Sequence, residues 1–311
     1  YNPAVSPDGH QIIFTESLSN YDVVSAKLDG TPPRMLIATE RNELMPAWAA
    51  NQPALVYVTN RNGPPEIWLR AGDSDRPLVS ARNFPLGTTQ AFMGPTLSPK
   101  ADRVIYTRLE KNGGIRLWIS AVSGGAPTTL TNEEVGIEWP GAWSPDGSWF
   151  VYVGTRNGKN DLMKVKSTGQ AAPSVLKGDV TPFPVIPSWS PAGNWIACGQ
   201  ELISPDGKTT RPLGNRGSPH YMFSYLFPYM FSADGKLVYG IREGDSRLLF
   251  YVDIESGAEK ELGDLGKDFT PSTNANPGIR YSLAPDGKSF VYAVAKNKSN
   301  LWLLEGFETR S

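Results

Sequence analysis

The chain has 311 residues, a formal net charge of −1, two histidines and one cysteine. Its 30 basic and 31 acidic residues nearly balance and are interspersed, which argues against nucleic acid as the main partner. A single cysteine excludes an internal disulfide, and no apolar run approaches the roughly 18 residues of a membrane-spanning helix.

A four-residue element related to Ser-Pro-Asp-Gly recurs seven times along the chain. The copies begin at Ser6, Ala49, Ser98, Ser144, Ser190, Ser232 and Ala284. An apolar residue precedes each copy: Val5, Trp48, Leu97, Trp143, Trp189, Phe231 and Leu283. These residues lie 42 to 52 positions apart, and a period near 40 to 50 with several short strands per unit is typical of one β-propeller blade per repeat.

The fourth copy shows what one repeat is expected to build. Residues 141–144 are short and apolar, as a buried inner strand should be. A tight turn follows, because Pro presets φ, Asp bonds its own backbone and Gly accepts a positive φ. Residues 149–153, 162–165 and 173–176 are further strands separated by turn residues. Four antiparallel strands joined in this way make one blade.

The sequence therefore predicts an all-β fold, a seven-bladed β-propeller of four-stranded antiparallel blades in one domain over residues 1–311. The blades are expected at about 1–38, 45–79, 93–131, 139–176, 186–213, 227–262 and 279–307. The last blade ends with a third strand at 300–307, and an open edge invites pairing with other chains. We therefore expect residues upstream of Tyr1 to complete it, or a blade of three strands.

Blade 5 contains a second Ser-Pro-Asp-Gly at 204–207, only 14 residues after the preceding copy. This interval is too short for another blade. We expect it to be the turn between the third and outer strands, with residues 196–200 turning directly into 201–204.

A residue at a fixed place closes the second strand of each repeat. These residues are Phe14, Tyr57, Tyr106, Tyr152, Cys198, Tyr239 and Tyr292. The ladder could form a ligand platform, but a fixed place in every repeat favours packing between neighbouring blades. The same interpretation holds for Trp68, Trp118 and Trp302 on the third strand.

The repeat resembles the TolB-type, WD-like propeller repeat, most clearly at residues 187–191 and 57–68. The resemblance covers nearly the whole chain, implies the fold and favours a periplasmic or extracytoplasmic location. TolB itself has six blades, whereas this chain shows seven units. The ending 300–307 also resembles propellers fused to bacterial serine/threonine kinases or winged-helix regulators, where the propeller is a sensor or interaction domain. The repeats are similar as well to propellers of prolyl-oligopeptidase-type peptidases and, more distantly, of oligogalacturonate lyases.

The small number of histidines and the lack of known catalytic motifs argue against catalysis by this chain. The two histidines, His10 and His220, cannot assemble a metal site of clustered histidines, so no metal and no cofactor are expected. No Gly-x-Ser-x-Gly, His-Glu-x-x-His, Cys-x-x-Cys or phosphate-loop pattern occurs. The carboxylate pair Glu133-Glu134 is typical of a solvated surface.

A ligand is expected on the face that carries the longer loops, around the channel mouth. Cationic residues stand two to four positions after the closing aromatic: Arg61, Arg108, Arg156, Arg242 and Lys296. They could form a positive ring for a carboxylate or phosphate, or each could bond its own turn or a nearby carboxylate. Glu43 and Glu138 lie on the same face and could neutralise such a ring.

The segment 220–231 alternates aromatic residues with a period of two. Its first part, with His220, Tyr221 and Tyr225, is expected near the channel mouth, as an amphipathic wall for a ligand or a hydrophobic plug. The most consistent function is non-catalytic binding of a protein, peptide or small ligand, as the sensor or interaction domain of a larger bacterial protein. The alternatives are a propeller accessory to or diverged from a hydrolase or lyase, and a TolB-like scaffold. We expect neither nucleic acid as a partner nor membrane insertion.

Overall fold

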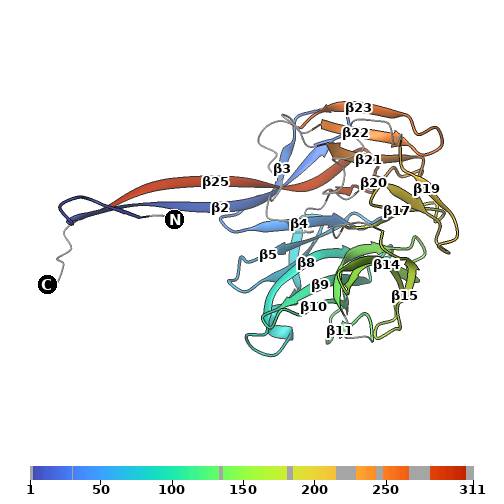
Figure 1. Ribbon diagram of the computed structural model, residues 1–311, viewed down its shortest axis with the longest axis horizontal. Coiled ribbons are helices and arrows are strands. Elements are labelled where there is room, and N and C mark those ends of the chain that lie inside the picture. The colour runs from blue at the N-terminus through green and yellow to red at the C-terminus, as the bar shows by residue number, and fades with distance from the viewer. Residues whose placement is uncertain are drawn as a thin grey trace.

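The computed structural model describes residues 3–29, 31–132, 136–180, 185–214, 229–242, 248–265 and 281–305, without the side chains of 16–19, 242 and 297–299. Strands form a ring of twisted sheets, and two very long strands, β2 (Gln11–Lys27) and β25 (Ser289–Glu305), extend from the ring as an arm (Figure 1). The only described helix is a 3₁₀ turn, η1 (Ala81–Asn83), which follows the second blade. The all-β propeller of antiparallel blades is therefore confirmed.

Five ring blades each use four consecutive strands, and their inner strands come first in the chain. The second repeat forms β4 (Glu43–Trp48), β5 (Ala54–Thr59), β6 (Glu66–Ala71) and β7 (Ser74–Ser80). The third forms β8 (Thr89–Leu97), β9 (Arg103–Glu110), β10 (Ile115–Ala121) and β11 (Thr128–Thr129). The fourth forms β12 (Ile137–Trp143), β13 (Trp149–Arg156), β14 (Lys159–Lys166) and β15 (Ser174–Lys177).

The fifth repeat forms β16 (Ser188–Trp189), β17 (Ile196–Cys198), β18 (Glu201–Ile203) and β19 (Thr210–Pro212). Here Cys198 pairs with Glu201 directly, and the turn at Ser204–Gly207 joins the third and outer strands, as the sequence predicted. The sixth repeat forms β20 (Met230–Phe231), β21 (Leu237–Arg242), β22 (Leu248–Asp253) and β23 (Glu259–Asp264).

Repeats two to six form five ring blades, and one more ring blade combines strands from the two ends of the chain. Its inner strand is β24 (Ser282–Leu283), its second strand is the first half of β25, its third is the second half of β2, and its outer strand is β3 (Arg34–Ile37). The inner strands contact one another in a closed cycle, β4, β8, β12, β16, β20, β24 and back to β4. Trp48 N donates to Ser282 Oγ at 2.9 Å across the closing junction.

The first two strand segments of the first repeat lie outside this ring, in the arm. There β1 (Ala4–Val5) pairs with Ile12 and Ile13 of β2, and that part of β2 pairs with the last part of β25. We call the arm the unit made of β1, residues 11–20 and residues 296–305. It has the strand order of a blade, inner, second and third, without an outer strand.

The structure thus differs from the sequence-based expectation in how the first and seventh repeats are placed. All seven repeats start a blade unit, but the described strands form six ring blades plus the arm, and the ranges 1–38 and 279–307 are not separate blades. The reason is that the first and last repeats exchange strands. Phe14 of β2 pairs with Trp302 of β25, and Val24 of β2 pairs with Tyr292 of β25, in one continuous register. The closing aromatic lies ten residues before the third-strand residue in both repeats, so β2 and β25 stay in register along their whole length.

All seven turns share a hydrogen bond from the first residue's backbone N–H to the carbonyl five residues on, and the turn at Ser144 shows the further bonds that serine adds. The Ser144 backbone N–H donates to the Trp149 carbonyl, and Gly147 N–H donates to the Ser144 carbonyl, both at 2.9 Å. Gly147 has φ +72, which a residue without Cβ adopts at little cost. The Ser144 hydroxyl also bonds Asp146, which lowers the pKa of that carboxyl together with the Ser148 backbone N–H.

The core lies between neighbouring blades. The aromatics that close the second strands are buried there: Tyr57, Tyr106, Tyr152, Tyr239 and Tyr292. Cys198 takes this place in blade 5, and burial raises the pKa of its thiol to about 12. Packing between blades is confirmed for these positions, whereas Phe14 and Trp302 are exposed in the arm.

Candidate binding site in the axial funnel

A funnel opens on the ring axis at the face of the tight turns. Its volume is about 270 Å³, and every ring blade contributes to its wall. The wall consists of the last residues of the inner strands and the first residues of the turns that follow. The aromatic and aliphatic members include Trp48, Leu97, Trp143, Trp189, Phe231 and Leu283, and the turns add Pro99, Pro145, Pro191 and Pro285.

The inner strands hold two of the tryptophans firmly. Trp143 is buried, and its Nε1 donates to the Thr96 carbonyl at 3.1 Å. Its ring meets the Phe150 ring edge-on at 5.8 Å, and the Arg103 guanidinium lies 5.0 Å from the Trp143 ring centre. Trp189 Nε1 donates to the Gly193 carbonyl at 3.4 Å. Rigid aromatic groups at fixed places lose little conformational entropy when a ligand packs on them.

The described wall contains no Asp, Glu, Lys, Arg or His. Such a wall can take up uncharged apolar groups. Its size suits a few side chains rather than a large ligand.

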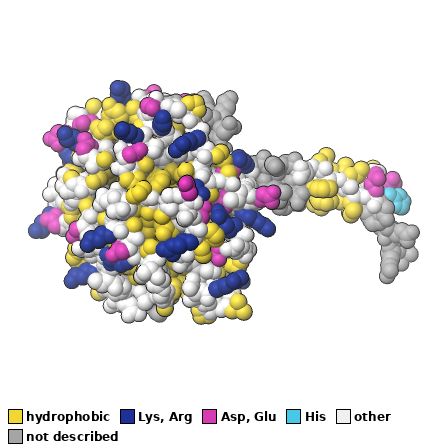
Figure 2. Space-filling model, turned by 180° about the vertical axis from the view of Figure 1, so that it is seen from behind, with side chains coloured by type: hydrophobic (Ala, Val, Ile, Leu, Met, Phe, Trp, Pro, Cys, Tyr) yellow, Lys and Arg dark blue, Asp and Glu magenta, His cyan; other side chains and the backbone are white. Residues whose placement is uncertain are grey.

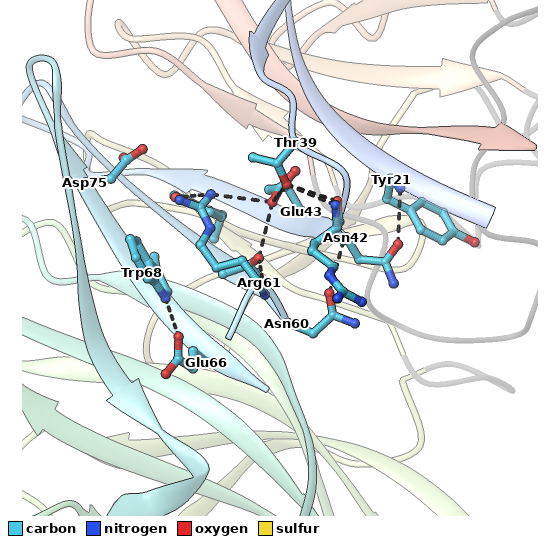
Figure 3. Close-up of polar contacts among 12 residues, drawn as sticks. Tyr21, Thr39, Asn42, Glu43, Asn60, Arg61, Glu66, Trp68 and Asp75 are labelled. Atoms are coloured by element: carbon cyan, nitrogen blue, oxygen red, sulfur yellow. Dashed lines mark hydrogen bonds and ion pairs between the residues drawn. The ribbon is translucent and has the colours of Figure 1, made fainter. Parts of the chain in front are cut away.

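On the opposite face, the Arg61 side chain is tied into its own blade (Figure 3). The Arg61 NH2 group donates to Tyr57 Oη at 2.9 Å and to Glu43 Oε1 at 3.4 Å. Glu43 is fully buried and also accepts from Thr39 Oγ1 at 2.7 Å. The guanidinium lies 4.3 Å from the Trp68 ring centre. These contacts join the loop before β4 to the end of β5.

Arg108 is similarly committed to its blade. Its Nε, NH1 and NH2 groups donate to Thr89 Oγ1, Glu110 Oε1 and Thr88 Oγ1 at 3.0, 2.6 and 2.6 Å. Its guanidinium also lies 4.2 Å from the Phe84 ring centre. Burial lowers the pKa of Arg108, and nearby Glu110 opposes that shift. The side chain is almost inaccessible to a ligand.

Glu138 occupies in β12 the place that Glu43 occupies in β4, five residues before the last tryptophan of the inner strand. It accepts from Thr131 Oγ1 at 2.5 Å and from Leu117 N at 2.8 Å. Burial raises its pKa, and these two bonds oppose the shift. Glu138 therefore joins two neighbouring blades.

Two further cations of the predicted ring, Lys296 and Arg156, lie among the described residues. Lys296 Nζ lies 2.5 Å from Oδ2 of the buried Asp22, and Arg156 ends β13, half-buried. The contacts of Arg61, Arg108 and Lys296 favour the interpretation that each cation bonds a nearby group. Arg242 ends β21, but its side chain lies outside the described residues, as do His220, Tyr221 and Tyr225. A ligand site on this face stays a prediction.

The placement of the two faces agrees with expectation in the ring. Asp146 precedes β13 and Arg156 ends it, and Asp286 likewise precedes β25, which carries Lys296 beyond its ring part. Asp8 is an exception: its turn joins β1 to β2 at the far end of the arm, which leaves the ring on the long-loop side. The expectation that Asp8 shares a face with Asp146 and Asp286 is therefore wrong.

Sequence reasoning assigned the funnel residues to the core and did not recognise them as a site. The signal was present, because the residue before each turn is aromatic or aliphatic and the turn itself often supplies proline. Residues at one place in every repeat must meet at the axis of a closed ring. Among the described residues, no three His, Cys, Asp or Glu side chains gather as a group that could hold a metal ion, and no helix is long and apolar enough to cross a membrane.

Residues 15–204 match the family model of the TolB beta propeller domain. This match covers more than half of the 311 residues. The chain belongs to this family. The putative TolB of Agrobacterium tumefaciens, a solved structure, shares the TolB propeller fold with a TM-score of 0.64 and 18% identity, over 90% of this chain and 99% of that one.

Two curated relatives of this TolB-type propeller differ in kind. Dipeptidyl-peptidase 5 of Porphyromonas gingivalis is 23% identical over 96% of this chain and 45% of its own length. The Tol-Pal system protein TolB of Anaeromyxobacter dehalogenans is 30% identical over 36% of this chain and 24% of its own length. The chain thus spans less than half of either relative.

Proposed function

We propose that this chain is a non-catalytic binding propeller whose axial funnel receives an uncharged, largely apolar segment of a protein partner. The observation that carries the proposal is the funnel wall, which all six ring blades build and in which the described residues include no charged side chain. Membership in the TolB propeller family supports a protein as the partner. The chain would act as the sensor or interaction domain of a larger bacterial protein, and a periplasmic location stays a prediction.

Binding can be tested with an array of uncharged peptides rich in proline and leucine, read by tryptophan fluorescence. Trp189→Ala removes a half-buried wall residue, and we expect it to weaken binding at least about tenfold, as truncation of a central aromatic anchor does. Trp149→Ala, on β13 and not among the wall residues, is the matched control and should bind normally. Added salt should change the affinity little, because no charge pair is involved. Equal losses in both variants, or none in either, would reject the funnel as the site.

A second candidate is a propeller that accompanies a peptidase, because the peptidase relative aligns over 96% of this chain. In that case the funnel would admit substrate to a separate catalytic domain. The Trp189→Ala variant would then alter substrate selection by the intact protein, whereas the isolated propeller would bind peptides only weakly.

A further inference from the structure

Three asparagine–glycine pairs lie in equivalent turns of three neighbouring ring blades. Each turn joins the second strand of its blade to the third, on the long-loop face. In chain order the pairs are Asn62-Gly63, Asn112-Gly113 and Asn157-Gly158. All six residues are exposed. Such a pair can modify itself, because a glycine has no Cβ to keep its backbone nitrogen away from the preceding side-chain amide.

The reaction needs only water as a co-reactant. The glycine nitrogen loses its proton and forms a bond with Cγ of the asparagine, and the side-chain nitrogen leaves as ammonia. Water then opens the resulting succinimide ring at one of its two carbonyls, which gives aspartate or isoaspartate. Since the attacking nitrogen must give up its proton, a hydrogen bond from that N–H to a carbonyl slows the first step, as it slows amide hydrogen exchange.

Two of the three attacking nitrogens are held by such a bond. Gly63 N donates to the Asn60 carbonyl at 2.8 Å, and Gly113 N donates to the Glu110 carbonyl at 2.9 Å. Gly158 N donates to no acceptor within the described part of the chain. The turn at Asn157 is therefore the one in which the attacking group is not engaged.

The geometry of this hairpin explains the difference. Arg156 pairs with Lys159, so the loop between β13 and β14 holds only Asn157 and Gly158. Their φ angles of +51 and +75 are those of a type I′ turn, which favours the sequence Asn-Gly. The bond that closes a β-turn uses the N–H of its last residue, so the N–H of the glycine before it is left out of the pairing.

The asparagine side chains differ in the same sense. Asn62 Nδ2 donates to Glu66 Oε2 at 2.8 Å, and Asn112 Oδ1 accepts from Gly114 N at 3.1 Å. The Asn157 amide makes no hydrogen bond with any described residue. Space does not distinguish the three pairs, because a Cβ placed on any of the three glycines would meet no atom within 4 Å outside the adjoining residues. Hydrogen bonding therefore does.

We propose that Asn157 is a site of spontaneous modification to aspartate or isoaspartate, whereas Asn62 and Asn112 are protected by their hydrogen bonds. Either product adds a carboxylate beside Arg156, a cation of the predicted ring, and isoaspartate also lengthens the backbone of the turn. Figure 2 shows basic and acidic side chains mixed over one side of the ring, and their totals nearly balance. The new charge therefore acts mainly at its own turn, and the long-loop face changes with the age of the protein.

The test is peptide mapping by mass spectrometry after the folded protein has been incubated at neutral pH in water enriched in oxygen-18. The heavy oxygen marks carboxyl groups that form during the incubation, and digestion at mildly acid pH in ordinary water keeps later conversion distinct. We expect Asn157 to convert at least about tenfold faster than Asn62 and Asn112, because a hydrogen-bonded turn must open before it reacts.

The chain unfolded in guanidinium chloride is the matched control. There all three pairs should convert at similar rates, because each has the same two residues and the turn bonds are lost. Asn62 or Asn112 converting as fast as Asn157 in the folded protein would overturn the proposal. So would an Asn157 that stays intact over the time in which the unfolded chain converts. An equal preference for Asn157 in the unfolded chain would overturn the role of the hydrogen bonds.

Discussion

The ring and the arm are built from the same repeat, yet their residues meet opposite environments. Tyr106 and Phe14 hold the same place in their repeats, and Tyr106 is fully buried whereas Phe14 is 37% exposed. The turns before them are alike, since Ser98 N and Ser6 N both donate to the carbonyl five residues on. The repeat therefore determines the local hairpin, and the neighbouring blade determines burial.

The largest expected effect contrasts these two aromatics. Tyr106→Ala should lower the free energy of unfolding by about 3–5 kcal/mol, because it leaves a cavity between blades and removes the bond to Ser120 Oγ. Phe14→Ala should cost less than about 1 kcal/mol, because half-exposed groups lose little. Urea unfolding measures both. An equal loss for Phe14→Ala would mean that the first repeat is buried inside the ring.

The next contrast concerns two glutamates. Glu43→Ala leaves Arg61 without its carboxylate and the Thr39 hydroxyl without its acceptor, at an expected cost of about 2–3 kcal/mol. Glu305→Ala removes only an exposed bond to Gln11 in the arm, and we expect less than about 0.5 kcal/mol. Thermal unfolding of both variants at equal protein concentration separates them. Similar costs would contradict the distinction between ring and arm.

A smaller effect is expected in how the free energy of unfolding depends on pH. Burial raises the folded-state pKa of Glu138 above its usual 4.5, so the unfolded state loses this proton first as the pH rises. The stability of the wild type relative to Glu138→Gln should therefore fall as the pH rises above about 4.5, and then level off above the folded-state pKa. Urea unfolding at a series of pH values gives this difference. A difference that grows with pH would show a lowered pKa instead.

The smallest effect should be the same in both regions. The Ser144 hydroxyl lowers the pKa of Asp146, and the Ser6 hydroxyl lowers the pKa of Asp8. Ser144→Ala and Ser6→Ala should therefore each raise the pKa of the aspartate two residues later, as followed by NMR titration. A shift in Asp146 without one in Asp8 would mean that the turn depends on the ring.

Local features were predictable from the sequence, because each repeat contains its own turn and strand pattern. This held even for blade 5, where the hairpin from Cys198 to Glu201 has no long loop. The ring closure was not predictable, because the strands of the first and last repeats can pair either within their own repeat or with each other. Phe14 can face Val24 in its own repeat or Trp302 in the last one, and both partners are apolar at the same spacing.

The candidate site was predictable only in part. The sequence predicted that Glu43 could neutralise the cations of the long-loop face, and Arg61 does bond Glu43, whereas a ligand site formed by these cations stays a prediction. The funnel depends on the convergence of equivalent residues such as Trp48, Trp143 and Trp189. The repeat in the sequence shows that these residues are equivalent. Only the closed ring brings them close together.

The central claim is that the first and last repeats exchange strands, so that a ring of six blades carries an arm. The direct measurement is disulfide formation in Phe14→Cys/Trp302→Cys against Phe14→Cys/Val24→Cys, by mass spectrometry at a concentration where the protein is monomeric. The buried Cys198, with its raised pKa, should not compete. We predict an internal disulfide in the Phe14/Trp302 pair only. A disulfide between positions 14 and 24 would contradict the account, because it requires each repeat to fold on itself.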